Sequence, residues 1–219
     1  MKKLVKGVLN FQREVYPENR DLFAELADGQ NPEILFITCS DSRIDPNLVT
    51  GSAPGDLFIC RNAGNVVPPH AYATGGMTAS IEYAVAVLGV RHIIICGHAD
   101  CGAIKGALDM SKLTGLPHVH EWLGHCRSAM DIVRERHDIP WGDAIDDCYL
   151  NECISQNVLQ QVQHIRTHPA VAAKQATGKV FVHGWIYDIK SGSIQASNEH
   201  CTKFLPFNER YRSVIESLG

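Results

Sequence analysis

Two short polar segments of the sequence contain the residue types from which metal sites are built. The segment CSDSR brings together a thiol, a carboxylate and a guanidinium in Cys39, Asp41 and Arg43. The segment GHADCG adds His98 and Cys101. Two thiolates, one imidazole and one carboxylate are ligand types that zinc accepts in tetrahedral sites.

The fourth coordination position of the zinc can be filled by Asp41 or by water. Arg43 can decide between them by pairing with the Asp41 carboxylate. An open site holds a water that is deprotonated near neutral pH and acts as a nucleophile. The residues alone therefore favour a catalytic zinc, with a structural metal or no metal as the alternatives. The sequence lacks the motifs of a four-ligand structural zinc site, a zinc deaminase or a thioredoxin-like dithiol.

Both segments follow predicted strands. Continuous apolar runs at 33–38, 56–60 and 91–97 predict strands that are buried on both faces. CSDSR follows the first run and GHADCG ends the third. Because open α/β sheets bind ligands beyond the carboxyl ends of their strands, we expect the two segments to face one another.

Helices are predicted between these strands. The expected helices are residues 2–16, 19–28, 75–89 (ending at Gly89), a helix that begins in CGAIKGALDM, 118–136 and 142–167. Residues 179–196 predict a strand followed by a hairpin around Ser191 and Gly192. The pattern predicts one α/β domain over 1–219, with a mostly parallel central sheet covered by helices, an N-terminal helical arm (1–28) and a C-terminal hairpin strand.

Composition excludes several classes of protein. The 219-residue chain has a net charge of −4, so it offers no basic field to nucleic acid or anionic lipid. It contains no run of 18 apolar residues that would span a membrane. Lys6 interrupts the N-terminal apolar stretch and no cleavage site follows, so we expect an unprocessed cytoplasmic protein. Its eight cysteines are then expected to be reduced, and together with 11 histidines they favour metal binding.

The same segments carry a family resemblance. CSDSR and GHADCG, joined by DLFICRNAGNVVPP and ASIEYAV, resemble the β-class carbonic anhydrases, in the bacterial branch that includes cyanate-operon and cyanobacterial enzymes. The resemblance implies a zinc lyase that reversibly hydrates carbon dioxide to bicarbonate. It assigns one zinc per chain to Cys39, His98 and Cys101, and it matches Asp41 and Arg43 to the catalytic dyad of the family.

The resemblance also implies a substrate pocket and an assembly. Substrate-binding positions of the family match Gln30, Phe58, Tyr83 and Gly102. A phenyl wall suits apolar carbon dioxide, and Gly102 lets the backbone approach closely, but Phe58 and Tyr83 are equally compatible with a plain core role. The family forms homodimers or larger homo-oligomers whose N-terminal helices reach across to the partner subunit. A cytoplasmic location follows, with carboxysome association as a possible addition.

One position departs from the bicarbonate-inhibited branch of the family. That branch has Trp three residues before the first zinc cysteine, where this chain has Phe36. Arg61 and Tyr187 match the other two residues of the inhibitory site. We therefore expect the constitutively open form, with Asp41 paired to arginine.

Two alternative functions remain open at this stage. The same fold and zinc site would serve hydrolysis of carbonyl sulfide or carbon disulfide. A non-catalytic, zinc-stabilised scaffold is the other alternative, although it has no use for the dyad. Cys60 and Cys96 are interpreted as core residues and His183 as structural.

Overall fold

The computed structural model of the protein describes residues 1–71 and 74–218, which fall into two compact units, Met1–Asn31 and Pro32–Gly219. The N-terminal unit contains helices α1 (Lys2–Asn10), a π-helical turn (Phe11–Val15), α2 (Tyr16–Glu18) and α3 (Arg20–Asp28). The two predicted N-terminal helices are thus confirmed, and the first runs slightly further than expected.

Three aromatic side chains join the helices of this unit. The ring of Phe23 lies 5.8 Å from the ring of Phe11 and 5.3 Å from that of Tyr16, between centroids. All residues of α1 are exposed, including its apolar ones. The helix therefore presents an apolar stripe that its own unit does not cover.

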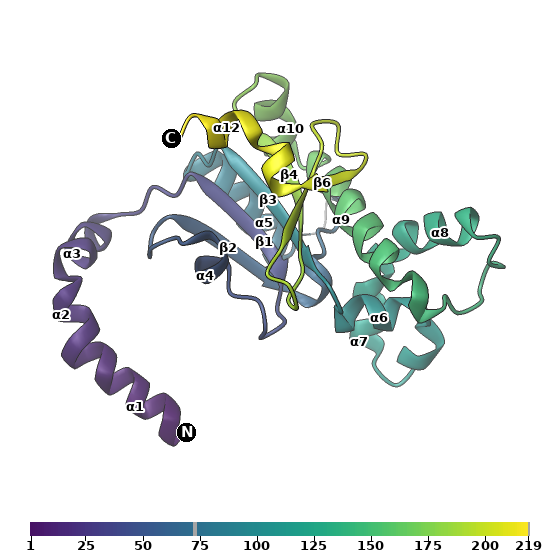
Figure 1. Cartoon of the computed structure of the whole chain (residues 1–219), viewed down its shortest axis with the longest axis horizontal. Helices are drawn as coiled ribbons and strands as arrows, with labels where there is room; N and C mark the ends of the chain where they lie inside the picture. Colours follow the sequence, from purple (N-terminus) through teal and green to yellow (C-terminus); the bar gives the residue numbers. More distant parts are fainter. Residues whose placement is uncertain (72–73, 219) are drawn as a thin grey trace. The chain divides into compact units, whose positions relative to one another are not determined.

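The second unit is built on a six-stranded sheet (Figure 1). Its strands are β1 (Ile34–Cys39), β2 (Leu57–Asn62), β3 (His92–His98), β4 (Phe181–Tyr187), β5 (Ile194–Ser197) and β6 (Phe204–Pro206), in the order β2-β1-β3-β4-β5-β6. The first four in this order are mutually parallel, and β5 and β6 are antiparallel additions. The predicted α/β class, mostly parallel sheet and C-terminal hairpin are confirmed.

Helices and short turns complete the unit. They are α4 (Pro46–Thr50), α5 (Gly76–Glu82) with a π-helical continuation (Tyr83–Val87), α6 (Gly102–Leu108), α7 (Pro117–Leu123), α8 (Arg127–Arg136), α9 (Leu150–Arg166), α10 (Pro169–Ala176), α11 (Phe207–Arg210) and α12 (Arg212–Glu216), with 3-10 turns at Ala63–Asn65, Met110–Leu113, Gly124–Cys126 and Asp147–Tyr149.

The predicted helix over 142–167 begins too early. Gly142 has a φ of +93°, which is outside the helical region, and the carboxylate of Asp146 accepts a hydrogen bond from the Cys148 N–H at 2.8 Å. These features produce a loop and a 3-10 turn before α9 begins at Leu150. The predicted helix over 118–136 is likewise two helices with a 3-10 turn between them.

Alternation along the strands buries both faces of the sheet. Leu35 and Ile37 of β1 belong to one apolar cluster, and Phe36 belongs to another on the opposite face. On the first face α9 packs very closely: a methyl group added at Gly97 would lie 2.6 Å from a methyl carbon of Val158. Helix α9 thereby fixes the end of β3, where His98 stands.

Candidate metal centre

Three predicted ligands meet at the carboxyl edge of the sheet. Cys39 ends β1, His98 ends β3, and Cys101 immediately precedes α6. Their ligand atoms lie within 4.8 Å of one another, and the two sulfur atoms are 3.9 Å apart. All three side chains are buried. The expectation that the two polar segments face one another is confirmed.

The ring of His98 is arranged as a metal ligand. Its Nδ1 lies 2.9 Å from the carbonyl oxygen of Ala99, which accepts only, so Nδ1 carries the proton and Nε2 carries the lone pair. That Nε2 is buried and has no hydrogen-bond partner within the described part of the chain. A buried acceptor without a partner costs free energy, and a cation between it and the two sulfurs would satisfy it. The donor set therefore fits zinc.

The two thiols are strongly coupled. A hydrogen bond from Cys101 lowers the pKa of Cys39 to about 4 in spite of burial, with smaller contributions from His98 and from the Gly64 N–H, which lies 3.4 Å from Sγ. The Cys39 thiolate and burial in turn raise the pKa of Cys101. Burial and the short distance between the two sulfurs therefore oppose a second thiolate, whereas a divalent cation stabilises both as thiolates.

Asp41 lies beside this cluster but is bound to Arg43. The guanidinium donates from Nε to Oδ1 at 2.9 Å and from Nη2 to Oδ2 at 2.7 Å. These bonds hold the pKa of the Asp41 carboxyl well below its usual range. Its Oδ2 lies only 3.8 Å from Nε2 of His98. The arrangement is the open one that Phe36 led us to expect.

Arg61 shapes the segment that carries Cys39 and Asp41. Its Nε donates to the carbonyl oxygen of Cys39 at 3.0 Å, and its Nη2 donates to those of Asp41 and Ile44 at 2.7 and 2.9 Å. This guanidinium is thus engaged with backbone carbonyls. This role could not be predicted from the sequence, because the contacts join β2 to a loop about 20 residues earlier.

The predicted substrate-binding residues lie in different places. Phe58 and Tyr83 contact one another with ring centroids 6.0 Å apart. Phe58 is in register with Leu35, four residues before Cys39, which places it roughly 13 Å along the sheet from the cluster. Within one chain the pair therefore does not line the metal position.

The other two predicted substrate residues are Gly102, next to a metal ligand, and Gln30, in the N-terminal unit. Gly102 directly follows Cys101, and a methyl group added there would meet no atom within 4 Å among the described residues. The fold of the chain therefore does not itself require glycine at this position. Gln30 belongs to the N-terminal unit. The substrate roles of all four residues remain predictions.

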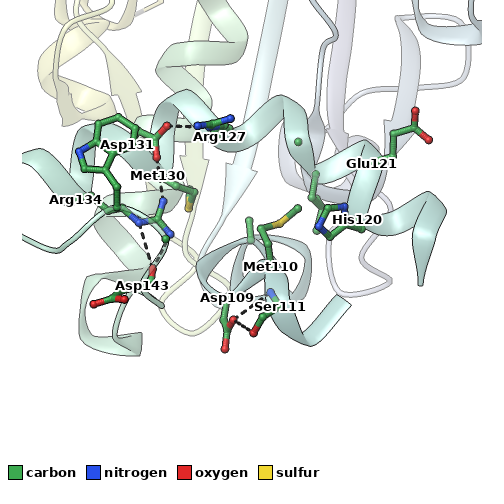
Figure 2. Close-up of a pocket in the computed structure, with 15 residues that line it drawn as sticks. Asp109, Met110, Ser111, His120, Glu121, Arg127, Met130, Asp131, Arg134 and Asp143 are labelled. Atoms are coloured by element: carbon green, nitrogen blue, oxygen red, sulfur yellow. Dashed lines mark hydrogen bonds and ion pairs between the residues drawn. The ribbon is translucent and has the colours of Figure 1, made fainter. Parts of the chain in front are cut away.

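A cavity of about 550 Å³ lies elsewhere in the second unit (Figure 2). Its walls include Met110, Leu123 and Met130, and Arg134 closes one side by donating to the Asp131 carboxylate at 3.0 Å. The three ligands, Asp41 and Arg43 do not line it. Cavity size therefore does not locate the metal cluster.

Comparison with known families gives the class of the protein. A sequence model of the family described as carbonic anhydrase matches residues 34–194, which include every residue of the cluster and the dyad. The chain belongs to the carbonic anhydrase family, in its β class, and is an enzyme of that family.

Individual relatives agree over most of the chain. It is 45% identical over 195 residues to a carbonic anhydrase of Synechococcus elongatus, covering 89% of this chain and 70% of that protein. It is 43% identical over 209 residues to one of Pseudomonas aeruginosa, covering 95% and 93%. The solved β-carbonic anhydrase CcaA superposes with a TM-score of 0.88 at 39% identity, covering 94% of this chain and 91% of that one. Tetrameric β-carbonic anhydrases of Sordaria macrospora give a TM-score of 0.77 at 32% identity, covering 89% and 95%.

Proposed function

We propose that this chain reversibly hydrates carbon dioxide to bicarbonate with one zinc held by Cys39, His98 and Cys101. The observation that carries the proposal is the buried set of three ligands, with the Asp41 carboxylate beside it. Arg43 binds both oxygens of that carboxylate. A zinc ion at such a site supplies the Lewis acidity that makes a water molecule nucleophilic near neutral pH.

The chain's own residues then orient the reactants. Asp41, ionised and fixed by Arg43, would accept a hydrogen bond from a water molecule beside the ligand cluster, since its Oδ2 lies 3.8 Å from Nε2 of His98. Its low pKa keeps it an acceptor only, so the lone pair of the nucleophile is directed toward carbon dioxide. The Ala99 carbonyl holds the His98 ring in place during this process.

The proposed substrate pocket requires more than one chain. Phe58 and Tyr83 are distant from the cluster of their own chain, so we propose that they line the site of a second copy, together with Gln30 and beside Gly102. Exposed apolar residues of α1, such as Leu4 and Val8, support a homo-oligomer. The Sordaria macrospora relatives are described as tetrameric.

We also propose a cytoplasmic location. All eight cysteines of the chain are free thiols in the structure, and seven of them are buried. Reduced thiols suit a reducing compartment. In residues 1–71 and 74–218, none of the helices combines the length and apolar character needed to cross a bilayer.

The test combines a zinc assay with stopped-flow carbon dioxide hydration on one sample. We expect about one zinc per chain. Replacing Cys39 or Cys101 by Ser is expected to abolish both zinc binding and hydration, because a hydroxyl is a far poorer ligand than a thiolate. The exposed Cys148 provides the control, since Cys148→Ser leaves the cluster intact.

Two outcomes would contradict the proposal. Full zinc occupancy in both ligand variants would refute the ligand assignment. A zinc-loaded wild-type protein without hydration activity would refute the substrate, and assays with carbonyl sulfide and carbon disulfide on that sample would then test the alternative.

A further inference from the structure

Arg43 is bound on two sides. One side of its guanidinium donates to Asp41, and the other donates to Asp100, which lies on the turn between His98 and Cys101. Nη1 of Arg43 donates to Oδ2 of Asp100 at 3.1 Å, and Nη2 donates to the Asp100 carbonyl oxygen at 3.1 Å. With the two bonds to Asp41, four guanidinium contacts fix the orientation of the group.

The backbone of Asp100 is adapted to this contact. Asp100 has a φ of +56°, in the left-handed region that Asp tolerates better than most residues. In this conformation its side chain and its carbonyl oxygen both reach the same guanidinium. Asp100 therefore ties the turn that carries two metal ligands to the arginine that controls Asp41.

Lys105 completes a chain of alternating charges. Its Nζ lies 2.5 Å from Oδ1 of Asp100, the oxygen that Arg43 does not use. A second carboxylate would otherwise compete with Asp41 for the charge of Arg43. Because Lys105 offsets the charge of Asp100, the guanidinium can be anchored on one side and still attract Asp41 on the other.

Exposure shows what this network contributes. The side chains of Arg43, Asp100 and Lys105 are 45%, 56% and 44% exposed. Ion pairs this exposed add little to the stability of a fold. Their geometry, however, restricts where the Arg43 fork can point, and that fork is what holds Asp41 away from the metal position.

We propose that Asp100, supported by Lys105, is a positioning residue that holds Arg43 in the orientation that keeps Asp41 off the metal. This inference rests on the proposed function, because the displaced carboxylate matters only where a metal site must stay open. Without the Asp100 carboxylate, Arg43 keeps on this side only the bond to the backbone carbonyl oxygen of residue 100, and its pairing with Asp41 breaks more often. Asp41 then binds the metal as a fourth ligand for a larger fraction of the time.

The variants are chosen to separate positioning from folding. Asp100→Gly removes the carboxylate, while glycine keeps the left-handed backbone and its carbonyl oxygen. Asp100→Asn keeps the shape and one acceptor, and Lys105→Met removes the supporting charge. Lys112→Met is the matched control, because Lys112 forms a comparable surface pair with Asp109 at 3.2 Å.

Each variant is loaded with zinc and examined by crystallography, thermal unfolding and stopped-flow hydration. For Asp100→Gly we expect Asp41 turned onto the metal in part of the molecules, kcat lowered about 5-fold with little change in KM, and Tm within about 2 °C of wild type. Lys105→Met is expected to lower kcat less than Asp100→Gly does. Asp100→Asn is expected to have a kcat between those of Asp100→Gly and wild type, and Lys112→Met is expected to match wild type.

Two results would overturn the inference. One is Asp100→Gly with Asp41 still fully on Arg43 and wild-type kcat. The other is a large fall in Tm with loss of zinc, which would make Asp100 a structural residue. Failure of the proposed function is distinguishable, because the zinc-loaded wild-type protein would then be inactive. The position of Asp41 in the crystals would still test whether Asp100 positions Arg43.

Discussion

At the scale of single residues, the chemistry depends on which partner Asp41 takes. A guanidinium offers two parallel donors to a carboxylate, and Arg43 presents both at 2.9 Å or less. A bound metal ion would offer a stronger charge, and Oδ2 of Asp41 lies only 3.8 Å from Nε2 of His98, one of the atoms that would hold that ion. The short distance means that a small rotation of Asp41 decides between an open and a closed site.

The variant Arg43→Ala tests this competition. Removing the fork leaves Asp41 held only by the backbone N–H of residue 43, which donates to Oδ1 at 2.9 Å, so Oδ2 can turn to become a fourth metal ligand. We expect zinc to stay bound, since its three ligands are intact, while hydration falls by about 100-fold or more. A crystal structure of the zinc-loaded variant should show Asp41 on the metal. Arg43→Lys keeps the charge without the fork, so its hydration activity is expected to lie between those of wild type and Arg43→Ala. Near-wild-type turnover in Arg43→Ala would refute the idea that Arg43 keeps Asp41 off the metal.

At the scale of elements, the ligands are placed by strand ends and by α9 behind them. Val158 of α9 fits against Gly97 and Gly184, where added methyl groups would lie 2.6 and 3.0 Å from its side chain. Two glycines on the neighbouring strands β3 and β4, two register positions apart, therefore let the helix approach the sheet next to His98. The position of one metal ligand depends on this close packing.

The variant Gly97→Ala should disturb both the packing and the site. The new methyl group has no room, so we expect a loss of about 2–3 kcal/mol in the free energy of unfolding and weaker zinc retention through displacement of His98. Urea unfolding and a chelator competition assay measure the two effects. The double variant Gly97→Ala, Val158→Ala removes the clash and should recover part of both losses; no recovery would show that α9 is not the obstacle.

A partly buried histidine of β4 makes the sheet sensitive to acid. His183 is hydrogen bonded to His92 at 3.2 Å and to Tyr211 at 3.3 Å. Burial, aided by the nearby charges of His92 and Arg210, lowers its pKa from 6.5 to about 4. The neutral form is thus favoured by folding, and the stability that it contributes is complete above pH 6.5 and decreases as the pH falls toward 4.

This linkage predicts a loss of up to about 2 kcal/mol in the free energy of unfolding between pH 7 and pH 5. Urea titrations at both pH values measure it. His183→Asn retains polar contacts without a group that titrates, so its stability should change less over the same range. An equal pH dependence in the variant and in wild type would assign the effect to other groups.

Elements and contacts differed in how far the sequence could predict them. β1 and β3 were predictable because buried parallel strands are continuously apolar, and the cluster followed because both strands end at one edge. β6 was missed because it is only three residues long and includes Pro206. The contacts that Asp100 and Arg61 make to the CSDSR segment were missed because they join residues 17 to 57 positions apart.

At the scale of the whole molecule, the chain contains an amphipathic helix, α1, whose apolar stripe is left uncovered by its own unit. Leu4 and Val8 of α1 are 67% and 53% exposed, one helical turn apart. Helix α1 continues through the π-helical turn and α2 to Glu18, and a helix in a folded protein gains most of its stability from packing of its apolar face. The catalytic proposal also requires a second copy, because Phe58 and Tyr83 do not reach the cluster of their own chain. We therefore expect a homo-oligomer.

The double variant Leu4→Asp, Val8→Asp tests the assembly. Light scattering on the wild-type protein should give a multiple of the 24.1 kDa chain mass, and the variant should shift toward smaller species at the same concentration, because charges on the apolar stripe oppose its burial. Lys3→Gln, on the same helix, is the control and should assemble as wild type does. If the substrate pocket is shared between copies, hydration falls in step with the loss of assembly while each chain keeps its zinc. A wild-type protein that is monomeric and fully active would refute both the assembly and the shared pocket.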